Sequence, residues 1–239
     1  MVGVVAITGI TIGITALGWT MAKRINFVRN YWKTCKSETL DTAHGVKCST
    51  WLVPEAAAAT AAATTTTATW FRVNDVIMGG KSTSELSTDD EGSGRLVFSG
   101  NLSTDGGGFC SMRTTEECAD RMRVPPDATA VRVVMQGDGQ LWKVSLGTSH
   151  SLMSRDPTWS HDVLTANSQE EDALTTATLP LADFTATIRG QPVAGAVLDD
   201  PSRIRSVGLI LSLYTQTGAP NPNFGDGPFR VVLHELEFV

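Results

Sequence analysis

The strongest constraint on the fold is an alternation of apolar and polar residues that runs from Trp70 to the C-terminus. Successive side chains of a strand point to opposite faces, so a period of two predicts strands with one buried face. Gly, Ser, Thr and Asp separate the runs, and no long stretch has the spacing of an amphipathic helix. The pattern predicts an all-β sandwich over residues 70–239, and its clearest strands are residues 131–136, 141–146, 207–214 and 229–238.

The first 22 residues carry no charged side chain and are rich in Ile, Val, Gly and Thr. At helical rise they would span roughly 30 Å, the thickness of a bilayer core. No basic segment precedes them, and they are neither Arg-rich nor amphipathic, so neither a signal peptide nor a transit peptide is indicated. Residues 1–22 are therefore predicted to be an uncleaved transmembrane anchor; the alternative is a buried core helix or hydrophobic hairpin.

Two features refine this anchor. Gly9 and Gly13 have a GxxxG spacing, which lets another helix approach closely within the membrane. The positive-inside rule places the basic cluster that follows on the cytoplasm-like side, which is the matrix of a mitochondrion or the stroma of a plastid. The lipid bilayer is thus a predicted partner, and the cluster comprises Lys23, Arg24, Arg29, Lys33 and Lys36.

Two further segments separate the anchor from the sandwich. Residues 23–55 are expected to form a basic, short helical or irregular connector. Residues 56–69 contain only Ala and Thr, which predicts a low-complexity linker without chemistry of its own.

Composition excludes several function classes. A net charge of -6 argues against a nucleic-acid partner, which would require a basic face. None of the four cysteines lies in a CxxC pair, so no zinc site is indicated and reduced thiols are expected. A bridge between Cys35 and Cys48 stays open as an alternative.

Signals of catalysis are sparse. The sequence has no GxSxG elbow and no HExxH motif, and its four histidines are scattered. The acidic turns lack the clustered oxygen ligands of a calcium loop. His161-Asp162 is expected to lie in a surface loop. We therefore predict a protein that is not an enzyme, with no catalytic residue, no cofactor and no metal.

The segment from Asn74 to Ser82 is the most informative motif. Gly79-Gly80 predicts a tight turn with positive φ, which Asn74 and Asp75 can cap by side-chain hydrogen bonds. The functional alternative is that Asn74, Asp75 and Ser82 project from one loop to grip a partner. A Met78→Lys change is expected to distort this loop.

Two other Gly-rich segments and one arginine accompany that motif. Gly106-Gly107-Gly108 precedes a strand, so it predicts a hairpin turn or a close backbone approach rather than a phosphate cradle. Gly137-Asp138-Gly139 predicts a hairpin turn. Arg113 is expected either to pair with Asp75 or Asp138, or to be simply solvated.

The order of these blocks resembles the complex I intermediate-associated protein family. Its opening signature, a Trp, an Asn-Asp and a Met-Gly-Gly-x-Ser, is matched by residues 70–82. Further similar blocks lie at residues 98–103, 106–113, 137–139, 179–184, 189–190, 204–209 and 227–229.

The resemblance implies a galactose-binding-like jelly-roll sandwich. It also implies a role in assembling mitochondrial complex I, either as an assembly factor or as an accessory subunit that binds membrane-arm subunits at the inner membrane. One alternative is a carbohydrate-binding module with aromatic platforms such as Trp142 or Trp159, and another is a plastid variant acting on photosystems. The candidate partner-binding loop residues are Asn74, Asp75, Met78, Gly79, Gly80, Ser82, Gly107, Gly108, Phe109, Arg113 and Asp138.

Overall fold

A computed structural model describes residues 42–47, 51–52, 67–89, 94–149, 154–167, 173–188 and 191–239. The predicted anchor, with Gly9 and Gly13, lies outside the described residues, as do Cys35 and Cys48. Within the described part, no helix has the length and hydropathy needed to cross a membrane.

The described chain is mostly strand. The strands are β1 (Thr42–Lys47), β2 (Thr67–Asn74), β3 (Thr83–Thr88), β4 (Leu96–Leu102), β5 (Phe109–Thr114), β6 (Ala130–Gln136), β7 (Leu141–Gly147), β8 (Thr158–Leu164), β9 (Leu174–Pro180), β10 (Thr185–Ile188), β11 (Gln191–Pro192), β12 (Ser206–Ser212) and β13 (Gly227–Phe238). Short helical turns are η1 (Asp75–Met78), α2 (Glu116–Arg121), η2 (Leu181–Asp183) and η3 (Pro201–Arg203).

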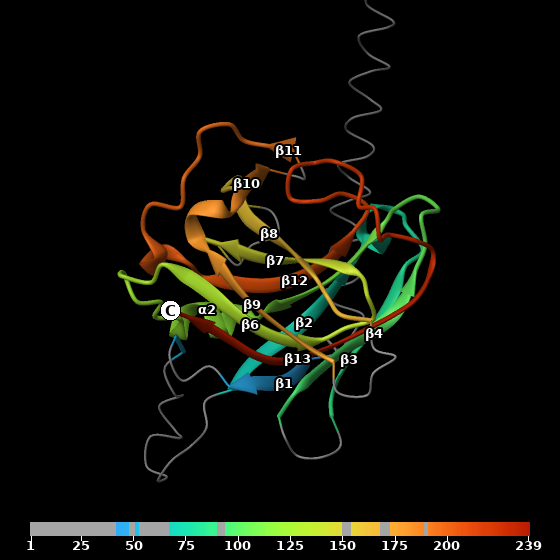
Figure 1. Ribbon diagram of the computed structural model, residues 1–239, viewed down its shortest axis with the longest axis horizontal. Helices are drawn as coiled ribbons and strands as arrows, with labels where there is room; N and C mark the ends of the chain where they lie inside the picture. Colours follow the sequence, from blue (N-terminus) through green and yellow to red (C-terminus); the bar gives the residue numbers. More distant parts are fainter. Residues whose placement is uncertain are drawn as a thin grey trace, which may run out of the picture.

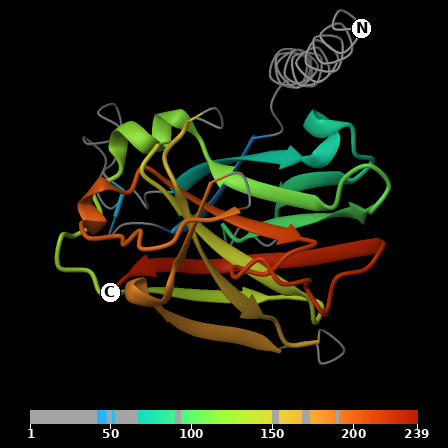
Figure 2. The same cartoon turned by 90° about the horizontal axis from the view of Figure 1, so that it is seen from above.

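The strands form two facing antiparallel layers, as the prediction of a sandwich requires (Figure 1, Figure 2). One layer has the order β11-β10-β8-β7-β12-β5-β2-β1, and the other has the order β3-β4-β13-β6-β9. A single parallel bridge between Lys47 and Glu235 joins β1 to β13 at one corner. β12 pairs with β5 and β7, so the prediction of a central strand at residues 207–214 is confirmed.

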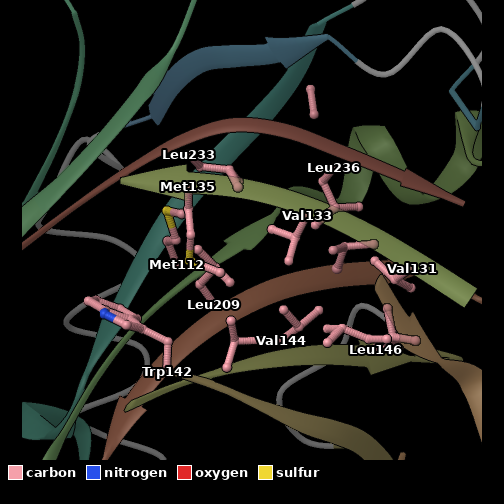
Figure 3. Close-up of a cluster of buried hydrophobic side chains, with 14 of the residues drawn as sticks. Met112, Val131, Val133, Met135, Trp142, Val144, Leu146, Leu209, Leu233 and Leu236 are labelled. Carbon is pink, nitrogen blue, oxygen red and sulfur yellow. The ribbon is translucent and has the colours of Figure 1, made fainter. Parts of the chain in front are cut away.

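The core lies between the layers and is filled by the inward residue of each alternating pair (Figure 3). Met112 and Leu209 reach it from one layer, and Met135 and Leu233 from the other. The alternation rule therefore succeeds because each strand sends alternate side chains into the core between the layers. The outer face of the larger layer is itself buried at Ser111 and Ser145.

The predicted domain boundaries need correction at the N-terminal side. β1 lies within the segment expected to be a connector, and β2 begins at Thr67, inside the expected linker. Trp51 is buried, and its Nε1 donates a hydrogen bond of 2.8 Å to the carbonyl of Leu236. β1 forms because the edge of β2 offers it an antiparallel partner, which its own sequence does not reveal.

The connections at one end of the sandwich carry most of the candidate residues. We call this the loop end and define it as residues 75–82, 103–108, 137–140, 164–167, 173–174 and 213–226. Antiparallel pairing brings these connections together, because each follows or precedes a strand that runs in the alternate direction.

Candidate functional site

The organising group of the loop end is the carboxylate of Asp75, which is completely buried. Its Oδ1 accepts a hydrogen bond of 3.0 Å from the backbone N–H of Ser82. Its Oδ2 accepts from the Ser82 hydroxyl at 2.7 Å, the Gly108 N–H at 2.7 Å and the Phe109 N–H at 3.3 Å. Four donors therefore compensate the burial of one charge, and they tie the connection after β2 to the start of β5.

Two glycines are required by the close approach of the backbone to this carboxylate. A Cβ at Gly80 would lie 2.3 Å from Asp75 Cγ, and a Cβ at Gly107 would lie 2.3 Å from Asp75 Oδ2. Gly79 has a different role: with φ of 97°, it ends η1 in the left-handed region, and its N–H donates to the Val76 carbonyl at 3.1 Å. The tight turn predicted at Gly79 is thus confirmed. Gly80 is required for a different reason, because its backbone packs directly against the Asp75 carboxylate.

Neighbouring side chains extend the network. Asn74 is buried, and its Oδ1 accepts a 2.7 Å hydrogen bond from the Ser84 hydroxyl instead of capping η1. The Ser82 hydroxyl also accepts the N–H of Ser103 at 3.1 Å. Asn74, Asp75 and Ser82 therefore point into the protein, and they shape the surface of the loop instead of contacting a partner with their own polar atoms.

The outer side of the same turn is apolar and open to solvent. Val76 is 45% exposed and Met78 is 59% exposed. A turn that is fixed from below by Asp75 thus presents two apolar side chains outward. Because Met78 points away from the network, a Met78→Lys change is no longer expected to distort the loop.

Asp138 lies at the same end but outside the Asp75 network. Its Oδ2 accepts a 2.7 Å hydrogen bond from the Arg230 N–H, and it borders an open groove that Glu85 and Asn101 also line. The hairpin predicted for Gly137-Asp138-Gly139 is wrong, because β6 and β7 belong to different layers and the turn crosses between them.

Gly106-Gly107-Gly108 likewise joins β4 to β5 across the two layers, so the close approach to Asp75 is confirmed and the hairpin is not. Arg113 stands opposite Phe71 and Gly208 in the middle of its sheet. Among the described ion pairs it has none with Asp75 or Asp138, and burial lowers its pKa. The predicted bracing pair is therefore wrong.

Further exposed apolar residues at the loop end were not predicted. Leu164, at the end of β8, is 56% exposed; Leu174, at the start of β9, is 51% exposed; and Tyr214, just after β12, is 52% exposed. The sequence signals these three residues only weakly: each is an apolar residue at the end of a strand, next to a polar turn. With Val76 and Met78 they are five exposed apolar side chains at this end of the sandwich.

Thiols and metal-ligating side chains are the remaining reactive groups of the described residues. Burial, reinforced by the Asp75 charge, raises the pKa of the Cys110 thiol to about 12, so this thiol is a poor nucleophile. Cys110 and Cys118 are both free and buried. No group of three metal-ligating side chains occurs in the described ranges.

Two sequence expectations about aromatic and polar residues are corrected. Trp142 and Trp159 are 0% and 6% exposed, so neither can stack on a sugar at the surface. His161 and Asp162 lie in β8 instead of a surface loop. The Asp162 carboxylate accepts the Gln216 N–H at 3.0 Å, and burial raises its pKa.

The comparison with known families agrees with the sequence blocks described above. Residues 60–233 match the family described as Complex I intermediate-associated protein 30 (CIA30). The chain belongs to this family. The matched range contains the whole Asp75 network, in which a buried carboxylate is held by donors from Ser82, Gly108 and Phe109.

Solved structures of low sequence similarity were also found. A family 11 carbohydrate-binding module from Clostridium thermocellum, in complex with a beta-1,3-1,4-mixed-linked tetrasaccharide, is 14% identical, with a TM-score of 0.40, over 70% of this chain and 87% of that chain. The same family's module from the cellulosomal cellulase Lic26A-Cel5E of that organism is 14% identical, with a TM-score of 0.39, over 71% of this chain and 88% of that chain. No match was found among curated proteins.

The close approach at Gly107 leads to a test of the network. Gly107→Ala is expected to lower the free energy of unfolding by about 2–3 kcal/mol, because the added methyl overlaps the Asp75 carboxylate. In an Asp75→Gly background the same change should cost less than about 1 kcal/mol, because the overlapping atoms are gone. Urea unfolding of the four proteins measures this coupling, and additive effects would contradict the assigned contact.

Proposed function

We propose that this protein is a membrane-anchored assembly or accessory subunit of mitochondrial respiratory complex I that acts by binding membrane-arm subunits. Membership of the CIA30 family carries the proposal, because the family is described as complex I intermediate-associated. The loop end supports binding over catalysis, since it combines rigid backbone with exposed apolar side chains. A preorganised turn loses little conformational entropy when a partner covers it.

The anchor and its orientation belong to the same proposal. Residues 1–22 have the length and composition of a membrane span, and the basic cluster follows directly. With this topology the sandwich lies on the matrix side of the inner membrane. A protein tethered in this way meets membrane-arm subunits at high effective concentration, so a modest loop-end surface suffices for retention.

Affinity purification of the tagged full-length protein in mild detergent tests the proposal. Membrane-arm subunits of complex I are expected to co-purify, and loss of the protein is expected to lower complex I abundance on native gels. Migration of the protein alone, with normal complex I after its loss, would contradict the proposal. Organelle fractionation distinguishes a mitochondrial protein from a plastid relative that acts on photosystems.

The exposed turn gives a sharper test. Val76→Lys/Met78→Lys is expected to reduce co-purification at least about tenfold, because two charges would have to be desolvated at the contact. The free energy of unfolding should change by less than about 1 kcal/mol, since both side chains are largely exposed. Val197→Lys is the control for a lysine at an exposed apolar position, because Val197 is 71% exposed outside the loop end. Unchanged co-purification of the double variant would exclude the turn from the contact.

A further inference from the structure

The strand β9 forms an open edge of the smaller layer. Among the strands that the structure describes it pairs only with β6, and the register is continuous from Ala130 opposite Pro180 to Gln136 opposite Leu174. Figure 2 shows β9 in orange at the lower margin of the molecule, outside β6. The backbone groups on its outer edge are therefore not used by any strand of the described chain, and they form a template for one more strand.

This edge lacks the protection that edge strands usually carry. Its sequence, Leu174-Thr-Thr-Ala-Thr-Leu-Pro180, contains no charge, and its only proline is the last residue. The pairing with β6 has no bulge. The opposite edge of the same layer, β3, has the exposed Glu85 at its centre, and the edge strand β11 has only two residues, one of them proline. Charge, shortness and proline block strand addition at those edges but not at β9.

The edge is continuous with the loop end proposed as the partner surface. The exposed Leu174 is the first residue of β9. The N–H of Ala166, which lies in the connection before β9, donates a 2.8 Å hydrogen bond to the Thr175 hydroxyl. A partner that covers the loop end could therefore extend along β9 without a break.

A second copy of this chain fits the edge poorly. Two-fold antiparallel pairing places only residues that point to the same face opposite each other. Leu174 and Leu179 point to opposite faces, so they could not meet. A two-fold axis through Thr176 would put Leu174 opposite Thr178 of the second copy. A two-fold axis through the next residue would put Leu174 opposite Pro180 of the second copy. Neither of these axes, which keep most of β9 paired with its copy, covers the exposed leucine with an apolar side chain.

We propose that β9 is a docking edge for an extended, uncharged segment of the membrane-arm partner, which adds as a further strand of the smaller layer. This inference rests on the proposed function. Main-chain hydrogen bonds to the outer edge of β9 supply the affinity, and alternate side chains supply the specificity. The segment has an aliphatic residue beside Leu174 on the outer face. It has small apolar residues on the inner face, where Ala177 packs against the core.

Amide hydrogen exchange of the full-length protein, alone and within the detergent-purified complex, tests this assignment. The amides of residues 174–179 that point away from β6 are expected to exchange at least about tenfold more slowly in the complex, because these free edge N–H groups gain acceptors. If membrane-arm subunits co-purify and these amides exchange as in the free protein, the inference is wrong while the proposed function stands. If wild-type protein retains no membrane-arm subunit, both are wrong.

A matched pair of variants provides a second measurement. Thr176→Lys/Thr178→Lys adds two charges to exposed positions of β9 and is expected to reduce retention about tenfold. Ser87→Lys/Thr88→Lys adds the same charge to exposed positions of the edge strand β3 and should retain the complex as the wild type does. Equal retention by both variants, or equal loss, would overturn the assignment of β9.

Discussion

Replacing Asp75 by alanine is expected to lower the free energy of unfolding by about 4 kcal/mol. The change leaves the N–H groups of Ser82, Gly108 and Phe109 and the hydroxyl of Ser82 without their acceptor in a site that water does not reach. It also opens a cavity beneath two glycines that pack against the carboxylate. Urea unfolding followed by tryptophan fluorescence measures the loss.

Asp105 provides the control, because it is a loop-end carboxylate that is exposed and forms an ion pair with Lys81. Asp105→Ala should change the free energy of unfolding by less than about 0.5 kcal/mol, the usual size for an exposed ion pair. Asp75→Asn is expected to be destabilising as well, because one amide oxygen cannot accept four donors and the NH₂ group faces other donors. A loss below about 1 kcal/mol for Asp75→Ala would show that the network is not what fixes the turn.

Asp75→Ala also distinguishes the residue that holds the turn from the residues proposed to contact the partner. In the wild type, Val76 and Met78 are exposed on a turn that Asp75 fixes from inside. Asp75→Ala should therefore reduce retention of membrane-arm subunits even at temperatures where the sandwich remains folded. Val76→Lys/Met78→Lys should reduce retention without the loss of stability. Within residues 74–82, the buried Asp75 is therefore assigned to holding the turn, and the exposed Val76 and Met78 are assigned to the proposed contact.

The sandwich itself was predictable because alternation reports burial on one face directly. The strands at residues 131–136 and 141–146 appear with bounds close to those expected. β1 was not predictable, because its six residues carry no alternation and its position depends on the edge of β2. The hairpins expected at the Gly-rich segments failed for a related reason: a turn signature fixes local backbone geometry but not which layer the next strand joins.

The candidate site was predicted in composition but not in orientation. The sequence grouped Asn74, Asp75 and Ser82 with Gly107 and Gly108, and the structure brings these segments together. Sequence spacing could not show that the carboxylate points inward and Met78 outward, because direction depends on the loop from residues 103–109 that closes over Asp75. Arg113 was misplaced because it lies partly buried in the middle of its sheet, opposite Phe71 and Gly208, and not at the loop end.

Trp142→Ala is expected to lower the free energy of unfolding by about 4 kcal/mol, as large truncations in a packed core do. Trp142 is completely buried between the layers (Figure 3), with its ring centroid 6.0 Å from that of Phe98 and 5.8 Å from that of Phe229. Both contacts are edge-on, so truncation removes favourable aromatic geometry as well as buried apolar area. Tyr214→Ala, at a residue that is 52% exposed, should cost less than about 1 kcal/mol.

Trp142→Phe separates the volume of this side chain from its polar atom. The indole Nε1 is buried without a hydrogen-bond partner among the described residues, so its removal relieves a desolvation cost that offsets part of the lost volume. The change is therefore expected to cost no more than about 1.5 kcal/mol, well below the loss for alanine. Chemical denaturation of both variants, combined with a glycan-binding assay, also decides the role of this residue. A Trp142→Ala protein of normal stability that lost sugar binding would place the ring at a surface and contradict the packing of the core.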